Sequence, residues 1–262
     1  AETFESEDYM SVVVAYKYAA NPQDASVGAD GTIDWSRAKP EISEYDPVAI
    51  QLGRNVADAQ GTELVGISVG TSALTHKMAT RNALSKGLDR ALLLGDDGVA
   101  TWSSTKVASA LANRVSKIEG ADLLITGDSS IDDGAKMTSA LAAGFLGWPC
   151  FQEVTGLEKT DEGYEVTQSI PGGTRTVSVV GSVVVAATPE AVTAKNPSMK
   201  EMLAAAKKQV DTVEEAALEL AEAPISVTGV AKPESKVRKN VLLSGSDAAV
   251  QLVAALRADG AL

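Results

Sequence analysis

The residues best suited to chemistry lie in one polar loop, GDSSIDDGAKMT, at positions 127–138. The loop brings hydroxyl, carboxylate and ammonium groups together: Ser129, Ser130, Asp132, Asp133 and Lys136. A helix is predicted to begin near Gly134, because Met137 and Phe145 frame an apolar stripe at helical spacing. Backbone N–H groups at a helix N-terminus attract anions, so the loop predicts a site for a phosphate or another anion.

Several roles are open for the charged residues of this loop. Asp132 and Asp133 are adjacent, so their side chains diverge in most backbone geometries, which disfavours a carboxyl pair that shares a proton. Three roles are considered for them, in order of preference: cap and loop residues, ligands of a nucleotide, and magnesium ligands. Lys136 either points to solvent or pairs with a bound phosphate.

An enzyme active site is hard to build from the remaining residues. His76 is the only histidine, and it is predicted to lie within a helix in a plain structural role. Cys150 is the only cysteine, which excludes a disulfide or a multi-cysteine metal site within this chain, and it is predicted to be a small buried residue. Neither a GxxxxGK[ST] loop nor an early GxGxxG motif occurs, so a P-loop enzyme and an ordinary dinucleotide dehydrogenase are poorly supported.

Apolar runs that alternate with helix-length segments must position the loop. The runs predicted as central strands are Ser11 to Tyr16, Leu64 to Val69, Ala91 to Leu94 and Asp122 to Thr126. The helices expected between them are Asp46 to Ala59, with Asp46 as the cap, a segment from Gly70-Thr71 to Gly87, and Val99 to Ile118. This alternation predicts an α/β fold with a doubly wound, mostly parallel sheet. Ligands of such sheets bind beyond the carboxyl ends of the strands, which predicts one common edge for Ala15 to Lys17, Ser68 to Thr71 and Gly127 to Thr138.

The second half of the chain changes its pattern. Antiparallel strands are expected at Gln152 to Ile170 and Thr174 to Ala187, added to the sheet. Helices are expected at Met199 to Gln209, at the acidic surface segment Asp211 to Ala223, and at Asp247 to Arg257. We predict a domain over residues 1–223, with residues 1–10 disordered, and an extended C-terminal arm over 224–262 that wraps this domain or a partner subunit. An Asp30-Gly31 turn is expected in the long connection 18–44.

Composition narrows the classes of partner. The 262 residues are 45% apolar and carry a net charge of −12, which is typical of a globular protein and argues against nucleic-acid binding. No apolar run approaches the roughly 20 residues that span a bilayer, so the chain is not expected to span a membrane. The acidic N-terminal sequence lacks the features of a signal peptide, and a cytoplasmic location is expected.

Six segments, in this order, resemble one known family: VVVAYK, SEYDPVAI, ISVG, RNALSKGLDRALLL, ADLLITGDSSIDDG and AAGFLGWP. Together they are similar to the β subunit of the electron transfer flavoproteins, from about Ser11 to Gly260. The resemblance implies a Rossmann-like, adenine-nucleotide-binding fold with a C-terminal arm, and an electron carrier rather than an enzyme. It also implies a heterodimer with an α subunit that holds most of the FAD, and transfer of electrons from a flavin dehydrogenase to a redox acceptor.

The resemblance further implies a bound AMP or, in electron-bifurcating members, a second FAD in its place. The positions that would line this site are Ala15, Ser43, Asp46, Ser68, Val69, Gly70, Gly127, Ser129, Asp133, Gly134, Ala135, Lys136, Met137 and Thr138. By resemblance, the phosphate meets backbone N–H groups of Gly134 to Thr138, and Asp46 or Ser43 meets the ribose. GFLGWP is closer to the AMP-binding members.

The chain departs from the family pattern at three places in two loops. Many members have Gly-Lys-Gln where this chain has Gly127-Asp128-Ser129, and Asn-Gln where it has Lys136-Met137. The segment similar to the family's partner-recognition loop ends in Asn196, Pro197, Ser198 and Met199, with Asn196 in place of a leucine. We therefore predict a dehydrogenase partner other than the usual acyl-CoA dehydrogenases.

Two further classes remain open. A homodimeric, adenine-nucleotide-binding stress or signalling protein would share the sheet but leave the C-terminal arm unexplained. A hydrolase acting on adenine nucleotides is third, because no positioned base is identified.

Overall fold

The computed structural model describes residues 11–223, 225, 228–229 and 240–262. The predicted disorder of residues 1–10 lies outside the described residues, as does much of the start of the predicted arm, at 224, 226–227 and 230–239. The division at residue 223 therefore stays a prediction.

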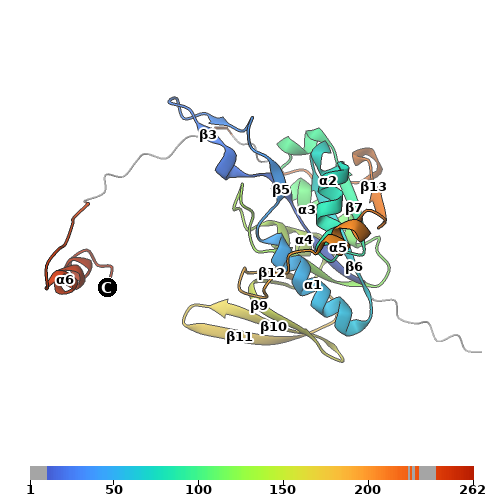
Figure 1. Cartoon of the computed structure of the whole chain (residues 1–262). Coiled ribbons are helices and arrows are strands. Elements are labelled where there is room, and N and C mark those ends of the chain that lie inside the picture. The colour runs from blue at the N-terminus through green and yellow to red at the C-terminus, as the bar shows by residue number, and fades with distance from the viewer. Residues whose placement is uncertain (1–10, 224, 226–227, 230–239) are drawn as a thin grey trace, which may run out of the picture.

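A single large sheet organises the fold (Figure 1). Within the described residues it has nine strands, in the order β11-β10-β9-β12-β8-β1-β6-β7-β13. The strands are β1 (Ser11–Ala15), β6 (Glu63–Gly70), β7 (Arg90–Gly95), β8 (Ala121–Gly127), β9 (Cys150–Lys159), β10 (Gly163–Ile170), β11 (Gly173–Val180), β12 (Val183–Ala187) and β13 (Val210–Thr212). The seven strands β9, β12, β8, β1, β6, β7 and β13, which are neighbours in this order, all pair in parallel. This confirms the doubly wound, mostly parallel sheet predicted from the sequence.

Strand order defines the point at which a ligand is expected. From β1 the chain proceeds to β6 and β7 on one side, and it then returns to place β8 and β12 on the other side of β1. The direction of winding reverses between β1 and β8. This gap is the topological switch point at which doubly wound sheets bind ligands.

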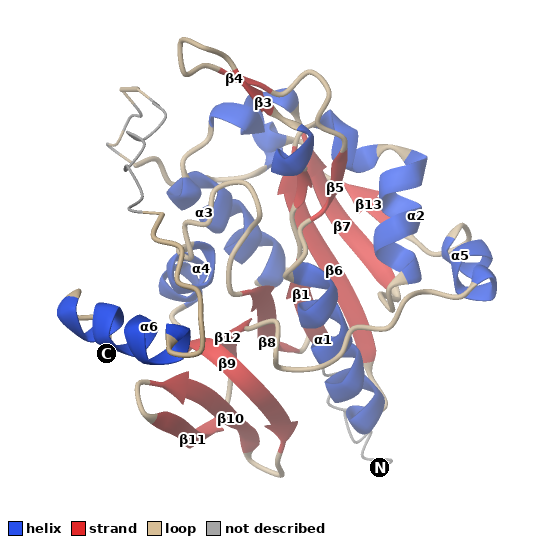
Figure 2. Cartoon of the chain, turned by 60° about the vertical axis from the view of Figure 1, so that its left-hand side comes forward, coloured by secondary structure: helices blue, strands red, loops and turns tan. Residues whose placement is uncertain are grey.

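Helices cover both faces of the sheet because its central strands are apolar on both sides. Val12 and Val14 belong to the core cluster formed with α1 (Asp46–Gln60) and α2 (Lys77–Ser85), whereas Val13 packs with α3 (Ser104–Val115) and α4 (Thr138–Leu146). Figure 2 shows the sheet between these two pairs of helices. Burial of each such valine stabilises the fold by about 1.5 to 3 kcal/mol.

Smaller elements complete the chain. Two short antiparallel pairs, β2 with β5 and β3 with β4, occupy the long connection after β1, and the Asp30-Gly31 turn predicted there joins β3 to β4. Their bounds are β2 (Tyr18–Ala20), β3 (Ser26–Val27), β4 (Ile33–Asp34) and β5 (Pro40–Ile42); 3-10 turns lie at Pro22–Asp24, Ser72–Thr75, Asp97–Thr101 and Glu215–Ala217. The C-terminal helix α6 (Ala248–Ala258) has no buried residue and lies apart from the sheet in Figure 1.

Several predicted helices were placed wrongly. The predicted helix Val99–Ile118 is a 3-10 turn followed by α3, because the Ser103 side chain accepts the N–H of Lys106 and starts the helix there. His76 precedes α2 instead of lying within a helix. Asp46 is the first residue of α1 and not its cap, because its side chain has other partners.

Two later predictions were also wrong. Val183–Ala187 was expected to be antiparallel, but β12 pairs in parallel with both β8 and β9, as befits a strand whose residues are all buried. The helix expected over residues 211–223 is absent from that described segment. Asp211 and Thr212 instead belong to β13, which pairs with β7. Further along, Leu218 and Leu220 pack onto the core beside α3 in an extended conformation. The antiparallel extension itself is confirmed for β9, β10 and β11, and α5 (Met199–Ala205) is shorter than predicted.

Candidate functional site

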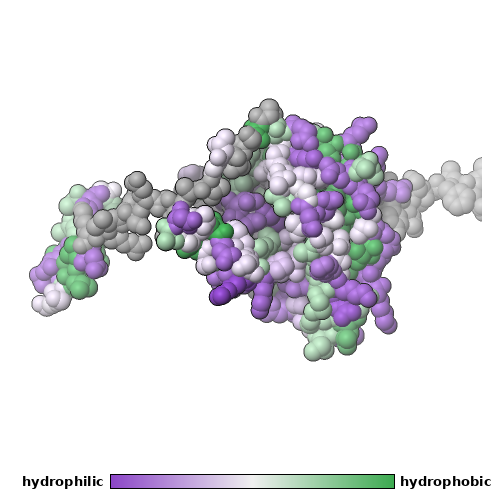
Figure 3. All heavy atoms as spheres, turned by 90° about the horizontal axis from the view of Figure 1, so that it is seen from above, coloured by the Kyte–Doolittle hydropathy of each residue, from purple (hydrophilic) through white to green (hydrophobic). Residues whose placement is uncertain are grey.

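The carboxyl ends of β1, β6 and β8 meet at one edge of the sheet. Ala15 lies opposite Ile67 of β6 and Thr126 of β8, so the residues that follow these strands emerge side by side. Figure 3 looks down on this end of the molecule, where hydrophilic residues predominate and apolar ones are scattered. The common edge predicted from the sequence is therefore present.

Asp46 ties the ends of two strands together. Its Oδ2 accepts the backbone N–H of Lys17, just after β1, at 2.6 Å, and the backbone N–H of Gly127 at the end of β8 also donates to its carboxylate. The side chain is buried, and burial raises the pKa of the Asp46 carboxyl from 3.8 to about 7. A carboxylate at the first residue of α1 thus holds the helix against the switch point.

Gly127 must be glycine in this arrangement. A Cβ at this position would lie 2.7 Å from Oδ1 of Asp46 and 2.8 Å from Cβ of Tyr45. Real Cβ atoms do not approach so closely, so the side chain of another residue would push α1 away from β8.

A buried hydroxyl at the same edge has no partner among the described residues. The backbone N–H of Ser43 donates to the Lys17 carbonyl at 2.9 Å, which fixes Ser43 beside the end of β1, but its fully buried Oγ has no hydrogen bond. The Ser68 hydroxyl is satisfied, because it donates to the Tyr16 carbonyl at 2.6 Å. An unpaired buried hydroxyl costs about 1 to 3 kcal/mol, and a ligand is one way to satisfy it.

Lys17 organises the first half of the loop that follows β8. Its Nζ lies 2.8 Å from Asp132 and 2.6 Å from Asp133. Partial burial lowers the pKa of Lys17, but the two carboxylates outweigh that effect and raise it overall. The neighbouring aspartates therefore share one ammonium ion, and Lys17, which was not among the predicted site residues, is central to the loop.

Lys136 organises the second half of the loop. Its Nζ lies 2.6 Å from Oδ2 of Asp128, a buried carboxylate, and 2.9 Å from Oε1 of Glu153 on β9. These carboxylates raise the pKa of Lys136. The ammonium group that was predicted to face solvent or a phosphate is paired within the protein.

The remaining predicted residues lie around the same edge. Val69 and Gly70 end β6; Gly134 has a φ of 60°, a conformation that suits glycine; and Thr138 is the first residue of α4. Met137, at the N-cap of α4, gives no side-chain hydrogen bond to the helix and is half exposed. Ser129 and Ala135 lie in the loop between β8 and α4. The first N–H groups of α4 therefore have no side-chain cap.

No metal site is formed by the part of the chain that the structure describes, where no three His, Cys, Asp or Glu side chains gather to hold an ion.

Cys150 is only partly buried, and burial raises the pKa of its thiol. No helix among the described residues has the length and apolar character needed to cross a membrane.

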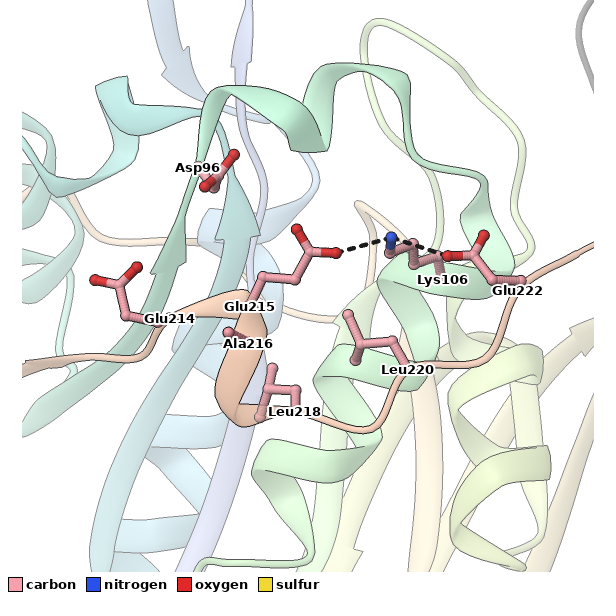
Figure 4. Close-up of a pocket in the computed structure, with 8 residues that line it drawn as sticks. All are labelled: Asp96, Lys106, Glu214, Glu215, Ala216, Leu218, Leu220 and Glu222. Atoms are coloured by element: carbon pink, nitrogen blue, oxygen red, sulfur yellow. Dashed lines mark ion pairs between the residues drawn. The ribbon is translucent and has the colours of Figure 1, made fainter.

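A separate cavity of about 530 Å³ lies beside the end of β7 (Figure 4). The segment after β13 lines one side of it, and Lys106 of α3 pairs there with Glu215 and Glu222 at 2.9 Å each. Its other charged lining residues, Asp96 and Glu214, are acidic. Excess negative charge disfavours a phosphate, so this cavity is a poor candidate for the predicted anion.

The predicted partner-recognition residues lie at the start of α5. Ser198 caps this helix in a reciprocal capping box with Glu201, and Ala205 is its buried anchor. Met199 is exposed, as are Met202 and Leu203 on the same short helix. Asn196 and Pro197 precede the cap in an irregular segment.

These features define the class to which the protein belongs. The strand order, the helices on both faces and the polar edge at the switch point are those of a doubly wound, Rossmann-like α/β protein. The sequence identifies the family. Residues 30–218 match the family model described as the electron transfer flavoprotein domain, which spans β4 through the 3-10 turn after β13. The chain therefore belongs to the electron transfer flavoprotein family, whose members are electron carriers that bind flavin and nucleotide.

Proposed function

We propose that this chain is the β subunit of an electron transfer flavoprotein. In this proposal it pairs with an α subunit that holds most of the FAD, and the heterodimer carries electrons from a flavin dehydrogenase to a redox acceptor. The family match over residues 30–218 carries the proposal. The six segments that resemble the β subunit support the choice of subunit.

The nucleotide proposed for this chain is AMP, bound at the switch point between β1 and β8. The unpartnered Oγ of Ser43 and the uncapped N-terminus of α4 fit a ribose hydroxyl and a phosphate, respectively. Asp46 would act by holding the strand ends in place, because its carboxylate already accepts two backbone N–H groups. When bound, FAD supplies the electron-carrying chemistry; the residues of this chain described here bind and orient the adenylate.

Nucleotide content tests the proposal. The chain would be co-expressed with the product of the neighbouring gene, and the FAD and AMP released from the denatured complex would be quantified by chromatography. One FAD and one AMP per yellow heterodimer is the expected result. Two FAD and no AMP would indicate the electron-bifurcating form, whereas a colourless homodimer that retains an adenine nucleotide would favour the stress or signalling class.

The recognition of partners is a further part of the proposal. Asn196 to Met199 and the exposed apolar side chains of α5 would contact the dehydrogenase, and the C-terminal arm with α6 would wrap the α subunit. The replacement of the usual leucine by Asn196 supports a dehydrogenase other than the acyl-CoA dehydrogenases. A swap of residues 188–202 into a relative should change which dehydrogenase reduces it, and unchanged rates would contradict this part. The cytoplasmic location stays a prediction.

A further inference from the structure

Lys136 lies in a strained backbone conformation that several contacts hold in place. Its φ is 51°, a left-handed value that costs a non-glycine residue about 1 kcal/mol or more. The Gln152 side chain donates to the Lys136 carbonyl at 2.7 Å, and the same Nε2 lies 3.2 Å from the Ser139 hydroxyl in the first turn of α4. Lys136, two residues before the start of α4, is thus anchored to β9.

Glu153, one of the two ion-pair partners of Lys136, lies at a second strained position of the backbone. Glu153 also has a positive φ, 53°, at an irregularity of β9, and its backbone N–H donates to Oδ1 of Asp128 at 3.2 Å. The other oxygen of Asp128 holds the Lys136 ammonium at 2.6 Å. Asp128 is itself fixed, because its N–H donates to the Ala187 carbonyl of β12 at 2.9 Å. One buried carboxylate therefore links the start of the loop, its end and the bulge of β9.

We propose that Lys136 is a positioning residue for the nucleotide, acting through Asp128 and Glu153, and that it does not contact the phosphate. This inference rests on the proposed function. The loop would recognise the phosphate of AMP through backbone N–H groups before α4, and Lys136 would hold those groups in place. The charge of the ammonium is already balanced by two carboxylates, so it offers little further attraction to an anion.

The two possible roles of Lys136 predict opposite effects for Asp128. If the ammonium contacts phosphate, replacement of Asp128 by asparagine frees it and removes a negative charge, and AMP binds more tightly. If the ammonium positions the loop, the same change releases Lys136 from the left-handed conformation, and AMP binds more weakly. Weaker AMP binding by Asp128→Asn would therefore be the opposite of what the removal of a negative charge alone predicts.

The experiment measures AMP affinity by equilibrium dialysis of the heterodimer after its nucleotide has been removed. Asp128→Asn and Lys136→Met are each expected to weaken AMP binding about tenfold. The double variant should bind no more weakly than the weaker-binding single variant, because both substitutions remove the same Asp128–Lys136 ion pair. Lys136→Arg retains both ion pairs and should restore affinity to within about threefold of the original. Glu153→Gln, at an exposed carboxylate, gives a smaller loss and serves if Asp128→Asn does not fold.

Lys159→Met is the matched control. Lys159 pairs with Asp122 near the amino end of β8, at 3.9 Å, far from the loop, so its loss leaves AMP affinity unchanged. Equal or tighter AMP binding by Asp128→Asn, with weaker binding by Lys136→Met, would overturn the inference and leave the proposed function intact. Failure of the original heterodimer to bind AMP would overturn both.

Discussion

The buried carboxyl of Asp46 makes the stability of this protein depend on pH in a specific way. Its pKa rises from 3.8 to about 7 in the folded state, chiefly through burial, so between these values the folded state holds a proton that the unfolded state has released. The stability contributed by this proton is full below pH 3.8 and is lost as the pH rises through about 7. This pH dependence of stability is opposite to that of an ordinary ion-paired carboxylate, whose contribution is lost as the pH falls.

Substitution of Asp46 by asparagine removes this titration and keeps an oxygen that can accept one backbone N–H. At about 1.4 kcal/mol per pKa unit, the difference in unfolding free energy between the original protein and Asp46→Asn should fall by about 2 to 3 kcal/mol from pH 5 to pH 8. Urea denaturation at four pH values across that range measures the difference directly.

Asp132→Asn is the control for this experiment. The pKa of Asp132 is raised by burial but lowered overall by its pairing with Lys17, so its titration lies below 3.8 and its difference curve should be flat from pH 5 to pH 8. A flat curve for Asp46→Asn as well would refute the reasoning, because it would show that Asp46 has released its proton by pH 5 in the folded state.

Three further predictions concern the edge of the sheet and the segment beside it. Gly127→Ala places a Cβ 2.7 Å from Asp46 and should destabilise the fold by about 1 to 3 kcal/mol in urea denaturation, whereas Gly144→Ala, which meets nothing within 4 Å on α4, should stabilise it by up to about 1 kcal/mol; equal effects would contradict the geometry. Ser43→Ala should leave the stability of the nucleotide-free protein unchanged or higher, since its Oγ has no partner there, and should weaken AMP binding about tenfold by dialysis; unchanged affinity would remove Ser43 from the site. Lys106→Ala breaks the pairs with Glu215 and Glu222, so hydrogen exchange should become faster at residues 213–222 and stay unchanged in α4.

The central fold was predictable because its strands carry a strong local signal. The runs around Val13, Ile67 and Leu124 are apolar on both faces, which is typical of strands covered by helices, and the helices between them have clear apolar stripes. The strand Val183–Ala187 carries the same signal. It was predicted as antiparallel together with the strands before it, although its run of buried valines is typical of a strand with parallel neighbours.

Errors arose where tertiary contacts decide between two local patterns. Residues 211–223 have an acidic composition with an Ala/Leu stripe that favours a helix. Leu218 and Leu220 are two residues apart, however, and this spacing partly buries both against the α3 side of the core when the chain is extended. The pairing of Lys17 with Asp132 and Asp133 joins residues more than 100 positions apart. No local pattern predicts such a contact, although the position of Lys17 at the end of the first strand placed it at the correct edge.

The charges around the switch point limit how an anion could be held there. Lys17 is balanced by Asp132 and Asp133, Lys136 is balanced by Asp128 and Glu153, and Asp46 adds a further carboxyl whose charge depends on pH. The ion pairs near this edge thus bring more carboxylates than ammonium groups, in keeping with a chain of net charge −12. In the site proposed here for AMP, the phosphate would therefore be recognised by backbone N–H groups, whose dipoles act at short range. The ion pairs fix the backbone from which those dipoles project, so in the proposed site the acidic residues of the loop would support anion binding by holding the backbone N–H groups in position.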